Sequence, residues 1–227
     1  MKLPDYTPMA KTRDALLCYG RGFWSARIRN WQKFFGGHLG KDVPTHVAEV
    51  IDVEALWEYL TYTGSFALSL FWGEMLGKHG RFVVAESTSI GGKVDGVRFT
   101  ALAKWLKKYN GKVKVRRMVT ERDEEFYREV AKFWYKHRNK PYEKKPVTQL
   151  IFSVVDCFGL FKAVKDLASV FCSEILAQLS IKMRMFPKGC VSAEVTPADY
   201  MDGSKVDKWM RRGAKVALYM KPERLEI

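Results

Sequence analysis

One cysteine stands where a helix is predicted to begin. Cys172 lies in the segment SVFCSEILAQLS, in which Ser169 can cap the following helix and place the thiol in its first turn. The unpaired N–H groups and the positive end of the helix dipole stabilise a thiolate, which is the reactive form of cysteine. Alternatively, Cys172 packs as a small apolar residue beside Val170, Ile175 and Leu176, because free cysteines are commonly buried. The segment alone leaves both interpretations open.

A thiolate nucleophile needs a base that also returns a proton to the leaving group, and histidine is the usual choice. The chain has four histidines, and only His46 begins a predicted strand, over residues 45–53, where a rigid backbone can fix its ring. The others lie in glycine-flanked loops or in a strongly basic stretch (His38, His79 and His137). We therefore expect His46 to be the base, and the alternative is a histidine that is hydrogen-bonded within the core.

A carboxylate that orients the His46 ring must approach it from the same face of the sheet. Within the strand over 45–53, Glu49 points to the opposite face, and Asp52 lies about 20 Å further along. Glu86 ends the predicted strand RFVVAE and reaches His46 if the two strands are neighbours. Glu86 is therefore the candidate orienting residue; otherwise it is an ordinary carboxylate at a strand end.

The order of these motifs resembles the circularly permuted NlpC/P60 superfamily, in which the His and the polar residue precede the Cys. The segments that carry the resemblance are THVAEV at 45–50, VVAES at 83–87 and CSEILA at 172–177. They are most similar to the group of YiiX-like and YaeF-like proteins, and the similarity spans about residues 13 to 203, including TPADY at 196–200. The resemblance implies a papain-like fold.

The resemblance also implies a Cys–His–Glu site. Cys172 would be the nucleophile, His46 the base and acid, and Glu86 the residue that orients the imidazole. The chemistry would be acyl transfer to sulfur, release of an amine or alcohol, and hydrolysis of the thioester, with the Cys172 backbone N–H as an oxyanion donor. Tyr142, in RNKPYEKK, lies in a segment similar to one of the family and is the candidate assisting tyrosine. Alternatively, Tyr142 is a loop aromatic that packs beside Pro141.

The predicted elements place most strands in the first half of the chain and most helices in the second. This order favours an α+β architecture, and the resemblance implies a small antiparallel sheet packed against helices. The predicted strands cover 14–19, 45–53, 81–86, 94–100, 112–119 and 214–220. The predicted helices cover 23–35, 102–109, 121–138, 149–168 and 170–181, with a helical turn at 197–201.

No linker or internal repeat divides the chain, so we expect a single domain over 1–227. Many relatives join the His strand to the Glu strand by a short hairpin, whereas 40 positions separate His46 from Glu86 here. Segment 54–80 is therefore a predicted insertion, helical in part, with Gly64, Gly73 and Gly77 as breaks. It would form either an apolar lid or acyl-chain groove, or an additional helix of the core.

Composition excludes several classes of protein. The chain has 227 residues, 47% of them hydrophobic, and a net charge of +14, which is globular rather than disordered or collagen-like. Its four cysteines form no CxxC pair and no zinc-finger spacing, so we expect no metal, no cofactor and no disulfide framework. The longest apolar stretch, 65–76, is shorter than a membrane span needs and contains Glu74. Without a recognisable signal peptide, we expect cytoplasmic synthesis and no transmembrane segment.

Three functions agree with these features. The first is a cysteine-dependent hydrolase of amide bonds, acting on cell-wall peptides at an anionic surface, which would explain the charge. The second is a lipid acyl hydrolase or acyltransferase of the same superfamily, suggested by the apolar stretch in segment 54–80. The third is a basic, non-catalytic binding or virion protein. Basic clusters with interleaved aromatics (104–117, 136–145 and 205–224) would suit nucleic acid, but no nucleic-acid motif accompanies them, so this partner is not favoured.

Overall fold

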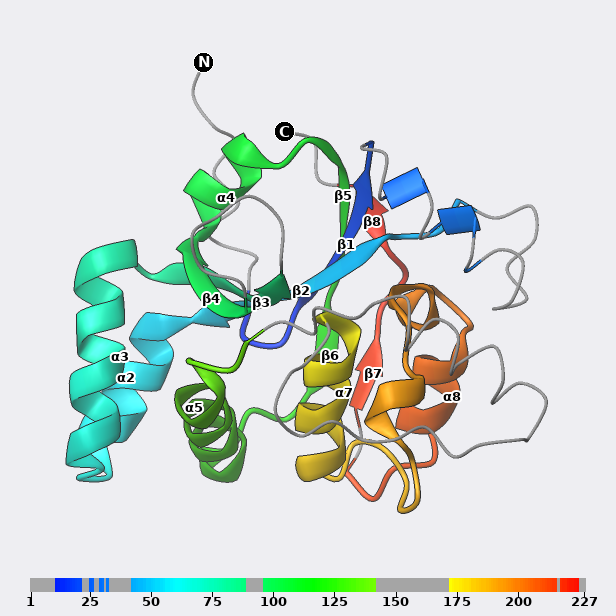
Figure 1. Ribbon diagram of the computed structural model, residues 1–227. Coiled ribbons are helices and arrows are strands. Elements are labelled where there is room, and N and C mark those ends of the chain that lie inside the picture. The colour runs from blue at the N-terminus through cyan, green and yellow to red at the C-terminus, as the bar shows by residue number, and fades with distance from the viewer. Residues whose placement is uncertain are drawn as a thin grey trace.

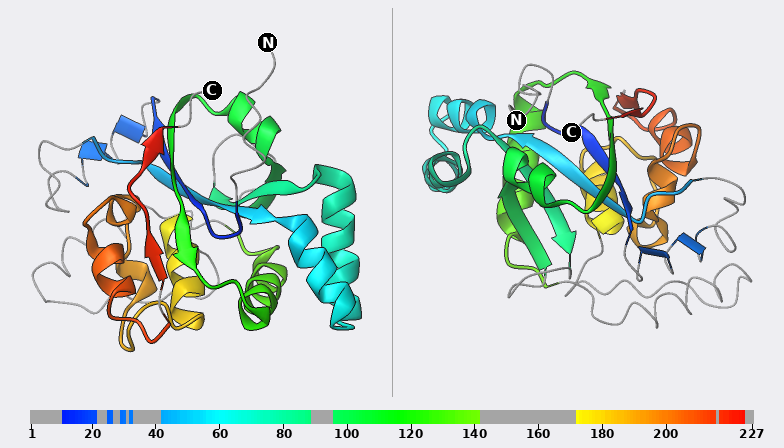
Figure 2. Two further views of the ribbon diagram at one scale, coloured as in Figure 1. Left: turned by 180° about the vertical axis from the view of Figure 1, so that it is seen from behind. Right: turned by 90° about the horizontal axis from the view of Figure 1, so that it is seen from above.

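A six-stranded antiparallel sheet lies at the centre of the protein (Figure 1), in the order β4-β3-β2-β1-β5-β8. The computed structural model describes residues 11–21, 25–26, 29–30, 32, 42–88, 96–141, 172–215 and 217–224. The strands of this sheet are β1 (Ala15–Gly20), β2 (His46–Asp52), β3 (Phe82–Thr88), β4 (Gly96–Ala101), β5 (Gly111–Arg116) and β8 (Glu223–Arg224). A two-stranded sheet pairs β6 (Met118–Thr120) with β7 (Ala217–Tyr219) beside it (Figure 2).

Helices cover both faces of the sheet, which confirms the predicted α+β class. On one face, the helix α4 (Leu102–Lys108) packs Trp105 and Leu106 against residues such as Val50 and Val84. The other face is covered by α2 (Val53–Tyr62), α3 (Phe66–His79), α5 (Glu124–His137) and α7 (Cys172–Lys182). The short helices η1 (Ser192–Glu194), η2 (Pro197–Tyr200) and α8 (Lys205–Met210) follow α7 along the chain.

Segment 54–80 folds into the antiparallel pair of helices α2 and α3. Asp52 caps α2 by accepting a hydrogen bond of 3.2 Å from the Ala55 N–H, and Gly64, with φ of 69°, lies in the turn that follows. The predicted breaks at Gly73 and Gly77 are wrong, because both lie inside α3. A glycine inside a helix costs only about 1 kcal/mol, which the buried apolar face of α3 outweighs.

The inner face of this helical pair belongs to the core. Leu56 and Leu60 of α2 and Trp72 of α3 are fully buried, and both helices contact α5. Phe66 and Leu70 of α3 face solvent. The prediction that segment 54–80 adds to the core therefore holds for one face of the α2–α3 pair. The opposite face exposes apolar side chains.

The prediction of one continuous strand over 112–119 is wrong, because the segment divides at Arg117 into β5 and β6. The Arg116 side chain turns inward and donates to the carbonyl oxygen of Met220 at 2.9 Å. The Met118 N–H then donates to the Asp14 carboxylate at 3.1 Å, so the chain leaves the central sheet. Most of the predicted helix 23–35 and all of the predicted helix 149–168 lie outside the described residues.

The C-terminal region holds three elements that were not predicted, η1, α8 and β8. All are short, and α8 has the sequence KVDKWM, in which charged residues interrupt any apolar period. Along the described residues, no helix is both long enough and apolar enough to cross a bilayer.

Candidate active site

The sheet register brings His46 and Glu86 together. Glu49 of β2 pairs with Ala85 of β3, so continuing the antiparallel register places Glu86 opposite Ala48. His46 then lies two residues further along on the same face, in the diagonal position that long side chains can bridge. The His46 Nε2 atom is 2.7 Å from Glu86 Oε2. The strands of His46 and Glu86 are therefore neighbours, as the choice of Glu86 required.

Glu86 is held by donors from three elements. Its Oε1 atom accepts hydrogen bonds from Arg98 of β4 at 2.7 Å and from the indole N–H of Trp105 of α4 at 3.0 Å, while Oε2 contacts His46. Burial alone would raise the pKa of Glu86, but His46 and Arg98 lower it to about 2. Glu86 is thus an ionised, buried carboxylate that presents one fixed oxygen to the imidazole.

α7 begins at Cys172, two residues after the start of the predicted helix over 170–181, so the thiol lies in the first turn as expected, against the His46 ring. Because Nε2 of His46 is engaged by Glu86, the other ring nitrogen, Nδ1, is the one left for sulfur. The backbone N–H groups of Val47 and Ser173 also donate to the Cys172 sulfur. Ser169, the predicted capping residue, lies outside the described part of the chain.

The electrostatics of this pair favour a thiolate and an imidazolium. Burial works to raise the pKa of the Cys172 thiol, but the charge and hydrogen bond of His46 and the backbone donors bring it below its ordinary value. Burial works to lower the pKa of His46, yet Cys172 and then Glu86 raise it well above its ordinary value. The Cys172 residue is only 5% exposed, and the His46 side chain is 13% exposed. The alternative that Cys172 packs as a small apolar residue is thus correct in that the residue is buried. It does not account for the polar contacts of the sulfur.

A second thiol near His46 provides a comparison. Cys18 of β1 pairs directly with His46 in the sheet, but its thiol donates to the Leu16 carbonyl oxygen at 3.3 Å. Burial raises the pKa of Cys18 well above its ordinary value, and burial also raises that of Cys190. Among the cysteines that the structure describes, Cys172 is the one whose thiol pKa is lowered.

Sequence reasoning missed the residues that surround the Cys–His–Glu set. Arg98 pairs with Glu86 in the register between β3 and β4, and a charged pair flanking the turn of a predicted hairpin was the available signal. Trp105 stacks on Tyr109 with ring centroids 5.0 Å apart, and the Tyr109 hydroxyl hydrogen-bonds Thr45, beside His46. Tyr142, the predicted assisting tyrosine, lies outside the described residues, so its role remains a prediction.

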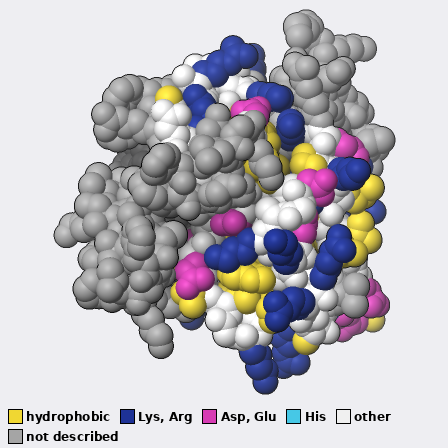
Figure 3. Space-filling view, turned by 90° about the vertical axis from the view of Figure 1, so that its right-hand side faces the viewer, with side chains coloured by type: hydrophobic (Ala, Val, Ile, Leu, Met, Phe, Trp, Pro, Cys, Tyr) yellow, Lys and Arg dark blue, Asp and Glu magenta, His cyan; other side chains and the backbone are white. Residues whose placement is uncertain are grey.

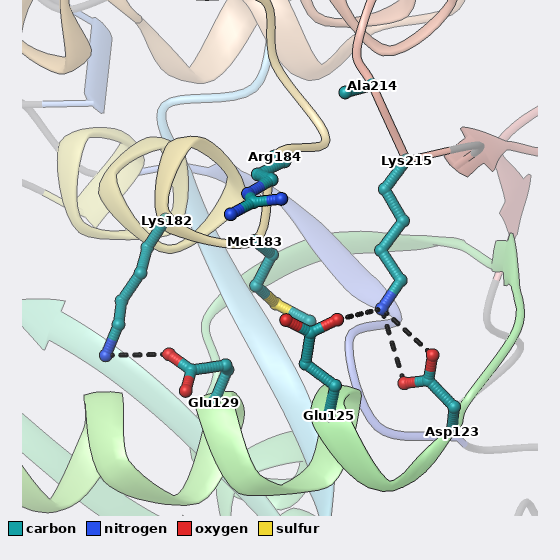
Figure 4. A pocket seen from close by; sticks show the side chains of 8 residues that line it. All are labelled: Asp123, Glu125, Glu129, Lys182, Met183, Arg184, Ala214 and Lys215. Atoms are coloured by element: carbon teal, nitrogen blue, oxygen red, sulfur yellow. Dashed lines mark hydrogen bonds and ion pairs between the residues drawn. The ribbon is translucent and has the colours of Figure 1, made fainter.

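A hollow elsewhere on the molecule is distinct from this site. It has a volume of about 440 Å³ and lies between α5, the C-terminal end of α7 and residues 214–215 (Figure 4). Ion pairs occupy much of its lining, with Lys182 3.0 Å from Glu129 and Lys215 3.1 Å from Asp123. Lys182 is ten residues along α7 from Cys172, which corresponds to about 15 Å of helix. The hollow therefore does not contain the reacting thiol.

Comparison with known proteins gives a structural similarity and no sequence family. No protein-family model matches the chain, and no curated protein matches it. The crystal structure of metalloprotein yiiX from Escherichia coli O157:H7 is similar at 15% identity and a TM-score of 0.47, covering 94% of this chain and 98% of that one. Within the described part of the chain, no three His, Cys, Asp or Glu side chains are grouped to hold a metal ion.

Proposed function

We propose that the protein is a cysteine-dependent hydrolase of amide bonds. One observation carries the proposal: the Cys172 thiol, at the start of α7, is hydrogen-bonded to an imidazole whose Nε2 is 2.7 Å from an ionised carboxylate. A thiol of lowered pKa, a base within hydrogen-bond reach and a group that orients the base are the three components of nucleophilic thiol catalysis.

The reaction follows from the roles of these groups. The Cys172 thiolate attacks the carbonyl carbon, and the Cys172 backbone N–H at the helix start donates to the oxyanion that forms. The His46 imidazolium then protonates the leaving amine, the C–N bond breaks and a thioester remains on sulfur. Neutral His46 next takes a proton from water, whose oxygen attacks the thioester, and the acid leaves as the Cys172 thiolate and the imidazolium are restored. Glu86 stabilises the imidazolium in both half-reactions.

The charge of the protein favours a substrate on an anionic surface, such as the peptides of cell-wall material. The net charge is +14, and Lys and Arg side chains are numerous on the face around α8 (Figure 3). A field of this sign raises the local concentration of anionic polymers and of the peptides attached to them. The charge thus bears on the surroundings of the scissile bond, and the chemistry at Cys172 is the same for any amide substrate.

A lipid acyl hydrolase is the second candidate, supported by a different observation. The α2–α3 pair exposes large apolar side chains, with Tyr62 87% and Phe66 73% exposed and Trp57 and Leu70 also facing solvent. Aromatic and aliphatic side chains arranged in this way suit contact with acyl chains. The same Cys172 nucleophile would then attack an ester and release an alcohol.

The test is hydrolysis by the purified protein of peptidoglycan-type peptides and, in parallel, of phospholipids. We expect cleavage of the peptides, loss of cleavage in Cys172→Ala with an unchanged circular dichroism spectrum, and normal cleavage in the matched thiol variant Cys190→Ala. Cleavage retained by Cys172→Ala would refute a thiol mechanism. Fatty-acid release without peptide cleavage would select the lipid candidate. Absence of both, with Cys172 inert to iodoacetamide at neutral pH, would favour a non-catalytic binding protein.

A further inference from the structure

A buried ion pair connects the strand that carries His46 to the helix that carries Cys172. The Arg13 guanidinium contacts the Glu49 carboxylate, and both side chains are fully buried. Arg13 also donates to Ser180 Oγ at 2.6 Å. Glu49 is three residues after His46 on β2, and Ser180 is eight residues after Cys172 on α7. One guanidinium therefore contacts both of the elements that hold the reacting pair.

Further hydrogen bonds extend this cluster. The Trp134 indole N–H of α5 donates to Glu49 Oε1 at 3.0 Å, while Oε2 contacts Arg13. The Ser180 hydroxyl accepts from Arg13 and donates to the Leu176 carbonyl oxygen at 2.9 Å. Both carboxylate oxygens and the serine hydroxyl are thus satisfied, while the Arg13 Nε atom is buried without a hydrogen-bond partner among the described residues. The hydrogen bonds that are made are directional, which apolar contacts are not.

Stability does not explain this cluster well. Arg13 has a φ of 78°, which costs a non-glycine residue about 1–2 kcal/mol and which glycine would adopt without strain. Burying an ion pair is often no better for stability than burying apolar residues of similar volume. An arginine at this position therefore has both a conformational and a desolvation cost. What distinguishes it from an apolar residue is that its hydrogen bonds are directional.

Directional contacts have a use here, because apolar packing alone permits α7 to slide or rotate on the sheet. Ile175 and Leu176 of α7 pack in the same cluster as Val47 and Ile51 of β2, and such apolar contacts are non-directional, so they do not specify a single orientation of the helix. A thiolate–imidazolium hydrogen bond depends strongly on distance and angle and changes greatly over a shift of about 1 Å. We propose that Arg13 and Glu49 are positioning residues that fix α7 against β2 and thereby fix the Cys172 sulfur against the His46 ring. The inference rests on the proposed function of that pair.

Arg116 provides a matched control, because it is the other fully buried arginine among the described residues. Its guanidinium binds Asp207 at 3.1 Å and the carbonyl oxygens of Tyr200 and Met220 at 2.8 and 2.9 Å. Within the described part of the chain, these partners belong to neither α7 nor β2. Substitution of Arg116 thus removes an equally buried cation without touching the connection between the two catalytic elements.

The experiment measures the rate of iodoacetamide alkylation at Cys172 against pH, with the site identified by mass spectrometry. In Arg13→Met we expect the apparent pKa of the Cys172 thiol to rise by about one unit or more, towards the free value of about 8.5. In Arg116→Met we expect no shift, although both variants unfold at lower denaturant concentration. Ser180→Ala keeps the ion pair and should shift the pKa in the same direction by a smaller amount.

The result decides the inference even if one variant does not fold. An unchanged thiol pKa in folded Arg13→Met would overturn it, as would an equal shift in Arg116→Met. If Arg13→Met is unfolded, an unchanged pKa in Ser180→Ala overturns it, because loss of this hydroxyl costs about 1–3 kcal/mol and is the smaller of the two perturbations. The readout needs no substrate, so failure to cleave peptides would refute the proposed function while this measurement would still test the positioning role.

Discussion

Arg98 and Glu86 lie directly opposite each other on β4 and β3, and the guanidinium is 2.7 Å from the Glu86 Oε1 atom. This pairing leaves Oε2 for His46. The carboxylate therefore has two separate tasks, in which one oxygen is anchored by Arg98 and Trp105 and the other orients the imidazole. Second contacts of this kind hold a catalytic side chain in place before substrate arrives.

Substitution of Glu86 by glutamine should lower hydrolysis strongly with little change of shape. The amide keeps the volume of the carboxylate but carries no charge to stabilise the His46 imidazolium. We expect kcat/KM to fall by about two to four orders of magnitude, in the range found when the carboxylate of a catalytic triad is lost. Steady-state kinetics measure the effect, and Glu74→Gln, at an exposed carboxylate of α3, is the control. Unchanged kinetics in Glu86→Gln would show that the carboxylate has no role in turnover.

The thiolate–imidazolium pair predicts a particular pH dependence of alkylation. The pKa of Cys172 is lowered, so its thiolate should form at a lower pH than an ordinary cysteine thiolate. The pKa of His46 is raised, so its imidazolium should keep its proton to a higher pH than an ordinary imidazolium. The reactive ion pair should therefore be present over a wide range of pH. At about pH 6, Cys172 should react with iodoacetamide faster than Cys190, whose pKa is raised by burial.

His46→Ala tests the source of this reactivity. Removal of the imidazolium leaves burial as the main influence on the thiol, so its pKa should rise and alkylation of Cys172 at about pH 6 should slow by about tenfold or more. His79→Ala removes a histidine at the end of α3 and should leave the rate unchanged. Equal rates in His46→Ala and the wild type would mean that the helix start alone activates the sulfur.

Acid should destabilise the protein partly through Glu86. The pKa of this carboxyl falls from 4.5 to about 2 in the folded state, because His46 and Arg98 outweigh its burial. A carboxylate with a depressed pKa contributes stability that is fully present above the unfolded value and is lost as the pH falls towards the folded value. The contribution is about 3 kcal/mol, lost between about pH 4.5 and about pH 2.

Urea unfolding at several pH values, compared between the wild type and Glu86→Gln, isolates this contribution. The variant should be less stable near neutral pH and should lose less stability than the wild type below about pH 4.5. Parallel loss in the two proteins would assign the acid sensitivity to other carboxylates, such as Asp123, whose pKa is also lowered.

The candidate residues could be named from sequence because local geometry and the resemblance to a known superfamily pointed to the same positions. Residue alternation along β2 separates His46 from Glu49, and the first turn of a helix identifies Cys172. Both features are visible in a few residues. The same local reasoning anticipated most strands, because alternating or apolar β-branched runs predict them.

The supporting contacts could not be predicted, because they depend on packing between distant segments. Arg13 and Ser180 are 167 positions apart, and Trp134 and Glu49 are 85 apart. Nothing near Glu49 in the sequence indicates that a buried cation faces it. The expected break at Gly73 failed for a related reason, since that glycine lies within α3 where the Trp57 ring packs closely against it.

Substitutions on the two faces of the α2–α3 pair should change stability by very different amounts. Trp72 is fully buried among aromatic rings, with Phe71 at 5.1 Å and Phe99 at 5.9 Å between ring centroids. Trp72→Ala removes those contacts and leaves a cavity, so it should lower the free energy of unfolding by about 3–5 kcal/mol. Phe66→Ala, at a side chain that is 73% exposed, should change stability by less than about 0.5 kcal/mol.

Urea unfolding of the two variants measures this difference in stability. Hydrolysis of peptides and of phospholipids by Phe66→Ala tests whether the exposed face binds substrate. If the exposed face takes no part in substrate binding, both activities should equal those of the wild type. A selective loss of phospholipid hydrolysis in the stable Phe66→Ala protein would instead show that this face contacts acyl chains, because a stability effect would lower both activities together.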